Sequence, residues 1–469
     1  MENIKRSITL KGPAKASVWY IASGAIARGI GALSTPIFTR LLTPAEYGLY
    51  PLYNTWLGVL SVLVTLEVTG SAIYRGFQRY GDKKDEFTSA ALGLIGAVFV
   101  GFCAVYFAFY GFLGRLTGLD VRITILMFAQ ILGTAVISLY LARARYEYKY
   151  KAVAALNMIS ALIIPLSAVA LILLLGIKAE SRIYASSLVT LLIALPLGFA
   201  IIKRSDKLYS RDTWRYLLGR SIPLLPHYFA TALILKAGEI SIGRAHGTAA
   251  LGRYSIATSV GMIMTVVTIG LTSALSPWII RKIRDGEIDK MRNFLFAITK
   301  ALALISLGVL AIAPEILSFL AAEGFREALP AVYPLEIGVI LSFLSGAVMS
   351  ASTYYERGGL TSLSSIAAAL VSVALSVFVL PRVDYRFAGI FALASYVILF
   401  IFTSLIFKKL SGEYPINIKK GTLTLLLTVA YAALLFLFRD VLISRIFLAL
   451  PLIPLLLLSA RDIWEMIRE

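Results

Sequence analysis

Three features of the sequence predict an all-α, polytopic integral membrane protein with about fourteen transmembrane helices. Hydrophobic residues make up 59% of the 469 positions, charged residues make up only 15%, and apolar stretches recur along the whole chain. A composition this apolar excludes a soluble globular protein.

Each apolar stretch is about 20 residues or longer, which is the length needed to cross a hydrocarbon core of about 30 Å. The stretches cover residues 16–40, 48–74, 87–113, 119–142, 152–176, 182–202, 217–242, 252–280, 293–314, 329–355, 359–380, 387–407, 421–438 and 443–460. The first follows a basic segment that resembles the start of a signal peptide. Because it continues to Leu42, we expect an uncleaved first helix.

The short connections between the stretches differ in their content of Lys and Arg. One side of the membrane receives most of the 45 basic residues, including the linkers at 75–84, 203–220 and 408–420, together with both chain ends. Lys and Arg in short loops tend to stay in the cytoplasm. The sequence therefore predicts a multi-pass protein of the plasma or inner membrane with cytoplasmic N- and C-termini.

A helical hairpin at residues 17–53 recurs about 204 residues later in the chain. Residues 241–244 take the place of 37–40, and residues 252–259 repeat the register of 48–55. Two repeats of six spans run in parallel, because an even number of spans preserves direction. We therefore expect an N-terminal lobe at 1–202, a cytoplasmic linker at 203–216, a C-terminal lobe at 217–407 and two further spans in 408–469.

Six charged residues lie inside the predicted spans, where a charge that faces lipid costs roughly 2.5–3.5 kcal/mol. They are Arg28, Glu67, Lys236, Glu239, Lys300 and Glu336. Arg28 and Lys236 occupy the first helix of each repeat, which favours a shared cationic cavity, and Lys300 is a further basic candidate. The three glutamates are candidates for ion coupling or for charge pairing. In the pairing alternative, Lys236 neutralises Glu239 on one helix face and Glu67 neutralises Arg28.

Three prolines are candidate hinges, since proline removes a backbone hydrogen bond from a helix. Pro36 lies near the end of the first span, and Pro223 and Pro226 lie at the start of the seventh. Fixed kinks that fit the helices together are the alternative interpretation.

Several classes of function are not expected. The single cysteine, Cys103, and the two histidines form no cluster with the spacing of a metal site, and we expect no metal, no cofactor and no catalytic residue. The formal charge of +19 is spread over short loops without a continuous basic face, so nucleic acid is not an expected partner.

A series of motifs follows in a fixed order along the chain. It comprises Pro36, Arg40, Glu46 and Gly48-Leu49-Tyr50, then Pro223-x-x-Pro226, Glu239 before Gly243, Gly252-x-Tyr254, Leu380-Pro381, Gly389-Ile390-Phe391-Ala392 and Tyr396. Together with the fourteen spans, this order resembles the polysaccharide-unit (Wzx-like) flippases of the multidrug/oligosaccharidyl-lipid/polysaccharide (MOP) exporter superfamily, to which the lipid II flippase is related.

The resemblance implies the fold of that superfamily, with spans one, two, seven and eight lining a central cationic cavity. It implies that alternating access moves an undecaprenyl-diphosphate-linked oligosaccharide to the outer leaflet, for the synthesis of O-antigen, capsule or exopolysaccharide. Arg28 matches the basic cavity positions of the family in type and helix. The implied partners are the lipid-linked sugar, membrane lipid, a polysaccharide polymerase and glycosyltransferases. We expect a monomeric transporter and not an enzyme.

Three alternatives remain open, of which a non-transporting scaffold is one. A multidrug or small-molecule exporter of the same superfamily would favour acidic and aromatic cavity residues for cationic drugs, whereas Arg28 and Lys236 are basic. A membrane enzyme acting on lipid-linked sugars, such as a polymerase or ligase, would need a long outer loop with catalytic residues, and the predicted outer connections are short.

Overall fold

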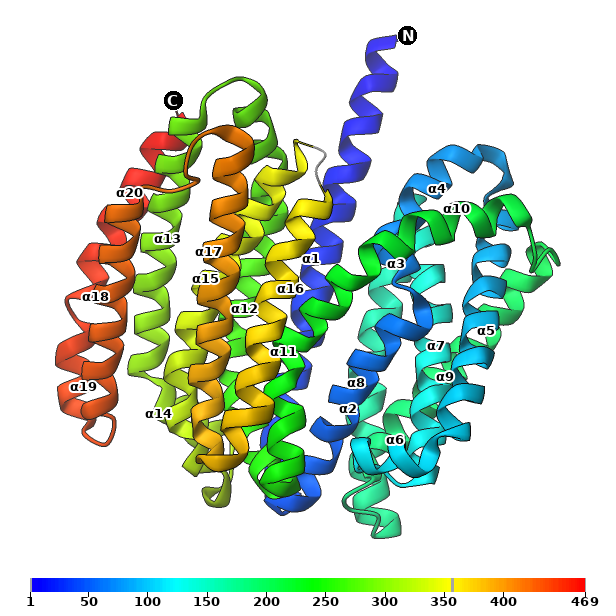
Figure 1. Ribbon diagram of the computed structural model, residues 1–469, viewed down its shortest axis with the longest axis horizontal. Helices are drawn as coiled ribbons and strands as arrows, with labels where there is room; N and C mark the ends of the chain where they lie inside the picture. Colours follow the sequence, from blue (N-terminus) through cyan, green and yellow to red (C-terminus); the bar gives the residue numbers. More distant parts are fainter. Residues whose placement is uncertain (1, 356–357, 469) are drawn as a thin grey trace. The chain divides into compact units, whose positions relative to one another are not determined.

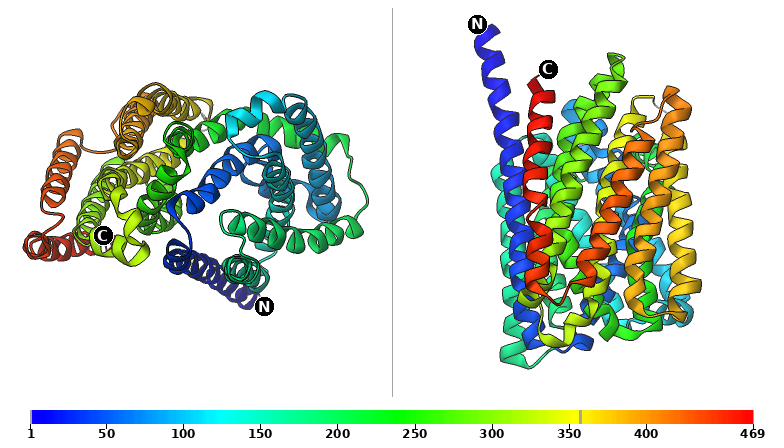
Figure 2. Two further views of the ribbon diagram at one scale, coloured as in Figure 1. Left: turned by 90° about the horizontal axis from the view of Figure 1, so that it is seen from below. Right: turned by 90° about the vertical axis from the view of Figure 1, so that its left-hand side faces the viewer.

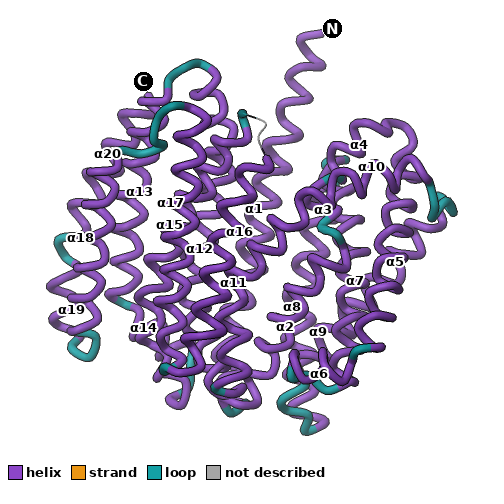
Figure 3. The backbone as a smooth tube through the Cα atoms, viewed as in Figure 1, coloured by secondary structure: helices purple, strands orange, loops and turns teal. Residues whose placement is uncertain are grey.

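The structure is a computed structural model that describes residues 2–355 and 358–468. Within these ranges the regular elements are all helices, which confirms the all-α prediction (Figure 3). The chain divides into two compact units, Met1–Ala232 and Leu233–Glu469, which we describe in turn (Figure 1).

The first unit is built from the helices of the N-terminal half. They are α1 (Glu2–Leu41), α2 (Pro44–Thr65), α3 (Val68–Ser71), α4 (Ile73–Tyr80), α5 (Lys84–Ala108), α6 (Tyr110–Thr117), α7 (Val121–Tyr146), α8 (Tyr150–Leu175), α9 (Ser181–Arg204), α10 (Arg211–Ser221) and the start of α11 (Leu225–Ala245). Helix α1 packs along α8, and α7 packs along α9 (Figure 2). The core of the unit gathers buried side chains of α4, α5 and α7, including Phe77, Phe87, Ile95 and Leu139.

A capping box defines the turn between α1 and α2. The backbone N–H of Thr43 donates to Glu46 Oε2 at 2.8 Å, and the backbone N–H of Glu46 donates to Thr43 Oγ1 at 3.3 Å. Pro44 occupies the first turn of α2, where its missing N–H costs nothing. The predicted hairpin is therefore set by local sequence, because both reciprocal bonds lie within four residues.

Helix α2 ends inside the predicted span 48–74, which the structure shows as broken. Leu66 and Glu67 adopt left-handed backbone angles, with φ of 50° and 46°. This conformation costs roughly 1–2 kcal/mol per non-glycine residue. The apolar pattern continues through these residues, so the hydropathy of the window did not reveal the break.

The residues predicted as a polar linker, 203–216, include the first half of helix α10. Ser210 caps this helix, and the indole N–H of Trp214 donates to the carbonyl of Ala90 on α5 at 2.9 Å. A 3₁₀ turn at Ile222–Leu224 then leads into α11. The seventh predicted span, 217–242, thus begins on α10 and bends at this turn.

The second unit continues with the remaining helices. They are α12 (Gly247–Arg284), α13 (Ile288–Ala311), α14 (Ala313–Leu320), α15 (Leu329–Thr353), α16 (Gly358–Ala374), α17 (Ala388–Ser411), α18 (Ile418–Leu437), α19 (Leu442–Ala449) and α20 (Leu452–Arg468). Helix α15 is central, since it packs against α12, α13 and α17. The C-terminal helices α18 and α20 pack on α13 (Figure 1).

Eleven helical segments of the described chain are long and apolar enough to cross a membrane. The other three of the fourteen predicted windows coincide with α1, α2 and α11, which contain 40, 22 and 21 residues. These three are long enough to span but do not meet the same criterion over the described residues. The chain is a polytopic membrane protein, and its first, second and seventh predicted spans fall on the three long helices outside this set of eleven.

Candidate functional site

Arg28 lies in the middle of the predicted first span, on α1, and its side chain is exposed. Its guanidinium forms no hydrogen bond or ion pair with any described residue. An unpaired charge at membrane depth must face water or bear the cost of desolvation. Arg28 is therefore suited to a hydrated surface that attracts anions.

Glu67 lies at the left-handed break that ends α2, and it does not pair with Arg28. A methyl group added at Gly70 would lie 2.9 Å from Glu67 Oε1 and 3.4 Å from the hydroxyl oxygen of Tyr228. Because Gly70 has no side chain, the space next to it stays open. The Glu67 carboxylate and the Tyr228 phenol both lie beside this space. The pairing alternative for Arg28 and Glu67 is not formed in the described residues, and a coupling role for Glu67 stays a prediction.

The three prolines differ in their surroundings. Pro36 is buried within α1, which continues to Leu41, and its carbonyl accepts bonds from Arg40 Nη1 at 2.9 Å and Thr39 Oγ1 at 3.2 Å. Pro223 lies in the 3₁₀ turn and Pro226 in the first turn of α11. The latter two mark a real change of helix type, while hinge motion at any of the three stays a prediction.

Lys236 and Glu239 form an ion pair on α11. Lys236 Nζ lies 2.8 Å from Glu239 Oε2, and Glu239 is only 9% exposed. This is the geometry of the pairing alternative. Lys236 retains partial exposure, so pairing with Glu239 does not remove it from contact with water.

Lys300 and Glu336 occupy different environments in the second unit. Lys300 Nζ on α13 lies 3.8 Å from Asp462 Oδ2 on α20, and both side chains are exposed. Glu336 on α15 is completely buried, and neither of its carboxylate oxygens has a hydrogen-bond partner. Lys300 thus contacts the C-terminal helix, whereas Glu336 lies inside the bundle. A carboxyl group without partners in such a place is costly unless it is uncharged.

Sequence reasoning missed Arg182, which is caged by the first hairpin. Its guanidinium carbon lies 4.7 Å from the ring centres of Phe38 and Tyr47, and 4.1 Å from that of Tyr50. The three rings belong to α1 and α2, and Arg182 belongs to the first turn of α9. The repeated aromatic hairpin was visible in the sequence, but its cationic partner on α9 was not.

We expect Arg182→Ala to lower the free energy of unfolding by about 2 kcal/mol, because cation–π contacts at desolvated sites contribute up to about that amount. Arg182→Lys should retain part of the stabilisation. Thermal melts of the purified variants in detergent measure the effect. Arg122→Ala, which removes an exposed arginine from the first turn of α7, is the matched control. Equal losses in both variants would contradict the role of the cage.

Sequence reasoning also missed an ion pair between Arg445 and Glu315. Arg445 on α19 is only 3% exposed and donates to both carboxylate oxygens of Glu315 on α14, at 2.7 and 2.6 Å. It also donates to the carbonyl of Ala311, the last residue of α13. This pair fastens the C-terminal helices to the rest of the second unit.

The sequence of this chain matches a known family. The family described as polysaccharide biosynthesis protein matches residues 14–282, which is more than half of the chain. The chain belongs to the polysaccharide biosynthesis protein family. The matched region of this family includes Arg28, Glu67, Lys236 and Glu239.

Solved structures share the fold of this family member. The lipid II flippase MurJ in an inward closed conformation aligns with a TM-score of 0.71 and 11% identity, over 96% of this chain and 100% of that chain. An outward-facing multidrug resistance MATE family transporter of the MOP superfamily gives a TM-score of 0.57 and 16% identity, over 86% and 97%. A MOP superfamily transporter from Pyrococcus furiosus Vc1 (DSM3638) gives 0.57 and 16%, over 85% and 96%. These likenesses confirm the predicted MOP fold.

The search of curated proteins found no match. Among the described residues, no group of three or more His, Cys, Asp and Glu side chains is arranged to hold a metal ion.

Proposed function

We propose that this protein is a flippase that moves an undecaprenyl-diphosphate-linked oligosaccharide repeat unit from the cytoplasmic to the outer leaflet by alternating access. The product serves the synthesis of cell-surface polysaccharide. The observation that carries the proposal is the exposed, unpaired guanidinium of Arg28 in the middle of α1, in a chain of the polysaccharide biosynthesis protein family. A guanidinium binds phosphate oxygens through two parallel hydrogen bonds.

The chemistry of the substrate suits such a residue. The sugar diphosphate head needs positive charge and a hydrated path, whereas the polyprenyl tail can remain in lipid. Moving about two negative charges outward across an inside-negative potential releases roughly 4.6 kcal/mol per 100 mV. The outward movement with bound substrate therefore needs no coupling ion. Glu67, Glu239 or Glu336 would act in the return of the empty transporter.

The proposal includes fourteen spans in two parallel six-helix lobes, at 1–202 and 217–407, with two further spans in 408–469. The position of α1, α2 and α11 outside the eleven apolar segments of the described chain supports it, because helices that border a hydrated cavity tolerate polar residues that lipid-facing helices do not. Arg28 lies on the first of these helices and Lys236 on the third.

We expect both termini to lie in the cytoplasm. A reporter that is active only in the cytoplasm, fused after Glu469, should be active in intact cells. The basic connections supply the reason, since most Lys and Arg lie on the side of the two chain ends. A full-length fusion with an inactive reporter would overturn this topology.

A multidrug exporter is the second candidate, because MATE family transporters share the fold. Vesicles containing the purified protein distinguish the two. We expect them to transfer a lipid-diphosphate-linked oligosaccharide between leaflets and to leave a lipophilic cationic dye where it was. Transport of the dye without transfer of the lipid-linked sugar would replace the flippase by the exporter.

A further inference from the structure

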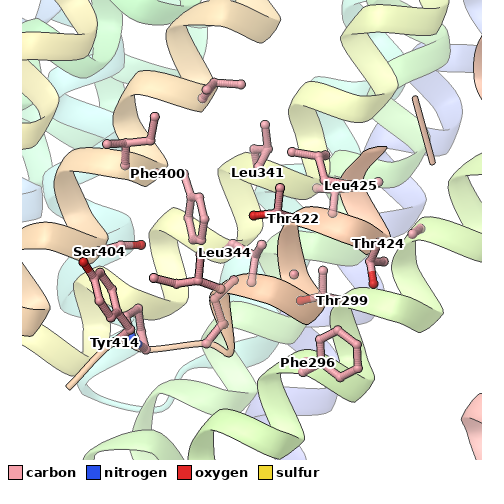
Figure 4. Close-up of a pocket in the computed structure, with 18 of the residues that line it drawn as sticks. Phe296, Thr299, Leu341, Leu344, Phe400, Ser404, Tyr414, Thr422, Thr424 and Leu425 are labelled. Carbon is pink, nitrogen blue, oxygen red and sulfur yellow. The ribbon is translucent and has the colours of Figure 1, made fainter. Parts of the chain in front are cut away.

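A pocket opens within the second unit between α13, α15, α17 and α18 (Figure 4). Its volume is about 420 Å³. Pockets that hold small ligands measure about 300–1,000 Å³. The walls are mostly apolar and include Phe296, Leu341, Leu344, Phe400 and Leu425. The pocket is thus large enough for a ligand and suited to a hydrocarbon chain.

One polar group in the wall has no partner. Ser404 on α17 lines the pocket, is only 8% exposed, and its hydroxyl forms no hydrogen bond with any residue that the structure describes. Other hydroxyls of the wall are satisfied within their own helices, since Thr299 donates to Leu295 and Thr428 donates to Thr424. A buried hydroxyl without a partner is costly, so a ligand that supplies an acceptor at Ser404 would be favoured.

Four exposed lysines, which we call the basic rim, flank in sequence the segment 414–418, which contributes lining residues to the pocket. Its members are Lys408, Lys409, Lys419 and Lys420. Lys408 Nζ lies 3.3 Å from the hydroxyl of Tyr414, which lines the pocket, and Lys419 and Lys420 lie between the lining residues Ile418 and Gly421 in sequence. Lys408 also follows Ser404 by four residues, which places both on one face of α17.

The acidic residue of this loop is already neutralised. Glu413 forms an ion pair with Arg292 of α13, which also donates to the carbonyl of Tyr414 at 3.3 Å. None of the four lysines of the basic rim pairs with a carboxylate in the described part of the chain. The basic rim therefore carries positive charge that no carboxylate of the described chain neutralises.

We propose that this pocket holds one acyl chain of an anionic glycerophospholipid, with its phosphate at the basic rim and an ester carbonyl accepting a hydrogen bond from Ser404. The acyl chain matches the apolar wall, the ester carbonyl matches the Ser404 hydroxyl, and the phosphate matches the basic rim. A polyprenyl phosphate would also offer a chain and a phosphate, but it has no ester carbonyl for Ser404. Basic residues beside membrane helices commonly recognise anionic lipid headgroups. This proposal does not depend on which substrate the protein transports.

The test measures binding of three probes to the purified full chain in detergent, by native mass spectrometry and by thermal melts. The probes are phosphatidylglycerol, phosphatidylcholine with the same acyl chains, and undecaprenyl phosphate. We expect saturable binding of phosphatidylglycerol with a rise in melting temperature, and at least tenfold weaker binding of the other two.

Variants assign the binding to this pocket. Ser404→Ala and the triple change Lys408→Gln, Lys419→Gln and Lys420→Gln should each weaken binding of phosphatidylglycerol several-fold. Thr422→Trp should block it, because Thr422 is exposed and lines the pocket, so the change need not disturb the core. The control is Lys203→Gln with Arg204→Gln, which removes two exposed charges at the end of α9.

Four results would overturn the proposal. Equal or tighter binding of undecaprenyl phosphate would assign the pocket to a polyprenyl chain. Equal binding of phosphatidylcholine would remove the role of the basic rim. Unchanged binding of phosphatidylglycerol in Thr422→Trp, or no saturable binding at all, would remove the site.

Discussion

Arg28→Glu is expected to abolish transfer of the lipid-linked oligosaccharide while leaving a folded protein. The change replaces attraction of the diphosphate by repulsion at the step where the head group loses water. Arg28→Lys should retain part of the activity, because a point charge still attracts phosphate but lacks the two-pronged hydrogen bonding of a guanidinium. The measurement is leaflet transfer in vesicles, beside a thermal melt of each variant.

The contacts of Arg28 sharpen this expectation. Because Arg28 has no described partner, Arg28→Glu removes no structural pair, and its melting temperature should stay close to that of the wild type. The exchange of Arg28→Glu with Glu67→Arg should not restore transport. Lys203→Glu, which reverses an exposed charge in the last turn of α9, is the control and should transport normally. Normal transport by Arg28→Glu, or rescue of both stability and transport by the exchange, would end the proposed role of Arg28.

Arg445→Met is expected to lower the free energy of unfolding by about 2–3 kcal/mol, the cost of breaking a charged, largely buried hydrogen-bond group. This is the lower part of the usual destabilisation for breaking a buried ion pair, because the Glu315 side chain is 47% exposed and can be rehydrated. The change also removes the donor to the Ala311 carbonyl. Thermal melts should show the loss. Limited proteolysis should show detachment of α18–α20 as faster cleavage of the C-terminal segment.

Two further variants control the prediction for Arg445. Arg439→Met removes a nearby arginine that forms an ion pair with its neighbour Asp440, at 3.6 Å, and contacts Phe436 of α18, so it should cost much less. Adding Glu315→Gln to Arg445→Met should recover part of the loss, since it removes the unpaired carboxylate. A loss in Arg439→Met as large as in Arg445→Met would contradict the assignment.

The pH dependence of the same pair follows from its carboxyl group. The hydrogen bond from Arg445 lowers the pKa of Glu315 from its ordinary value of 4.5, against the opposing effect of burial. A carboxyl whose pKa is lower in the folded state stabilises the fold above its unfolded pKa and loses this contribution as the pH falls through the folded pKa. The stability difference between wild type and Arg445→Met should therefore be full at pH 7 and shrink below about pH 4.5. A difference that stays constant down to pH 3 would contradict this.

Much of the fold follows from local sequence. Each of the fourteen apolar windows falls on one helix or on consecutive helical segments, because the need to pair backbone groups inside the membrane leaves helices as the available structure for such stretches. The turn at Thr43–Glu46 follows from a capping box within four residues. The break at Leu66 and Glu67 could not be predicted in this way, because it lies within an apolar pattern that is compatible with an unbroken helix.

The sequence also supplied the candidates for charge at membrane depth. For Lys236 and Glu239 it supplied the pairing, since the two are three apart on one helix. For Arg28 it could not decide between a pair with Glu67 and exposure, because that choice depends on how α1 and α2 are rotated about their axes. Among the residues that the structure describes, Arg28 has no partner.

The sequence by itself determined the membrane class, the helical content, the repeated hairpin and the candidate charges, because each depends on composition or on residues close together in the chain. Only the tertiary structure decided that Arg445 meets Glu315, 130 residues earlier, that Arg182 lies among Phe38, Tyr47 and Tyr50, and that Ser404 faces an apolar pocket without a partner. The reason is physical: contacts between helices depend on the depth and rotation at which they pack, and hydrophobic periodicity constrains both only loosely when most faces of a helix are apolar.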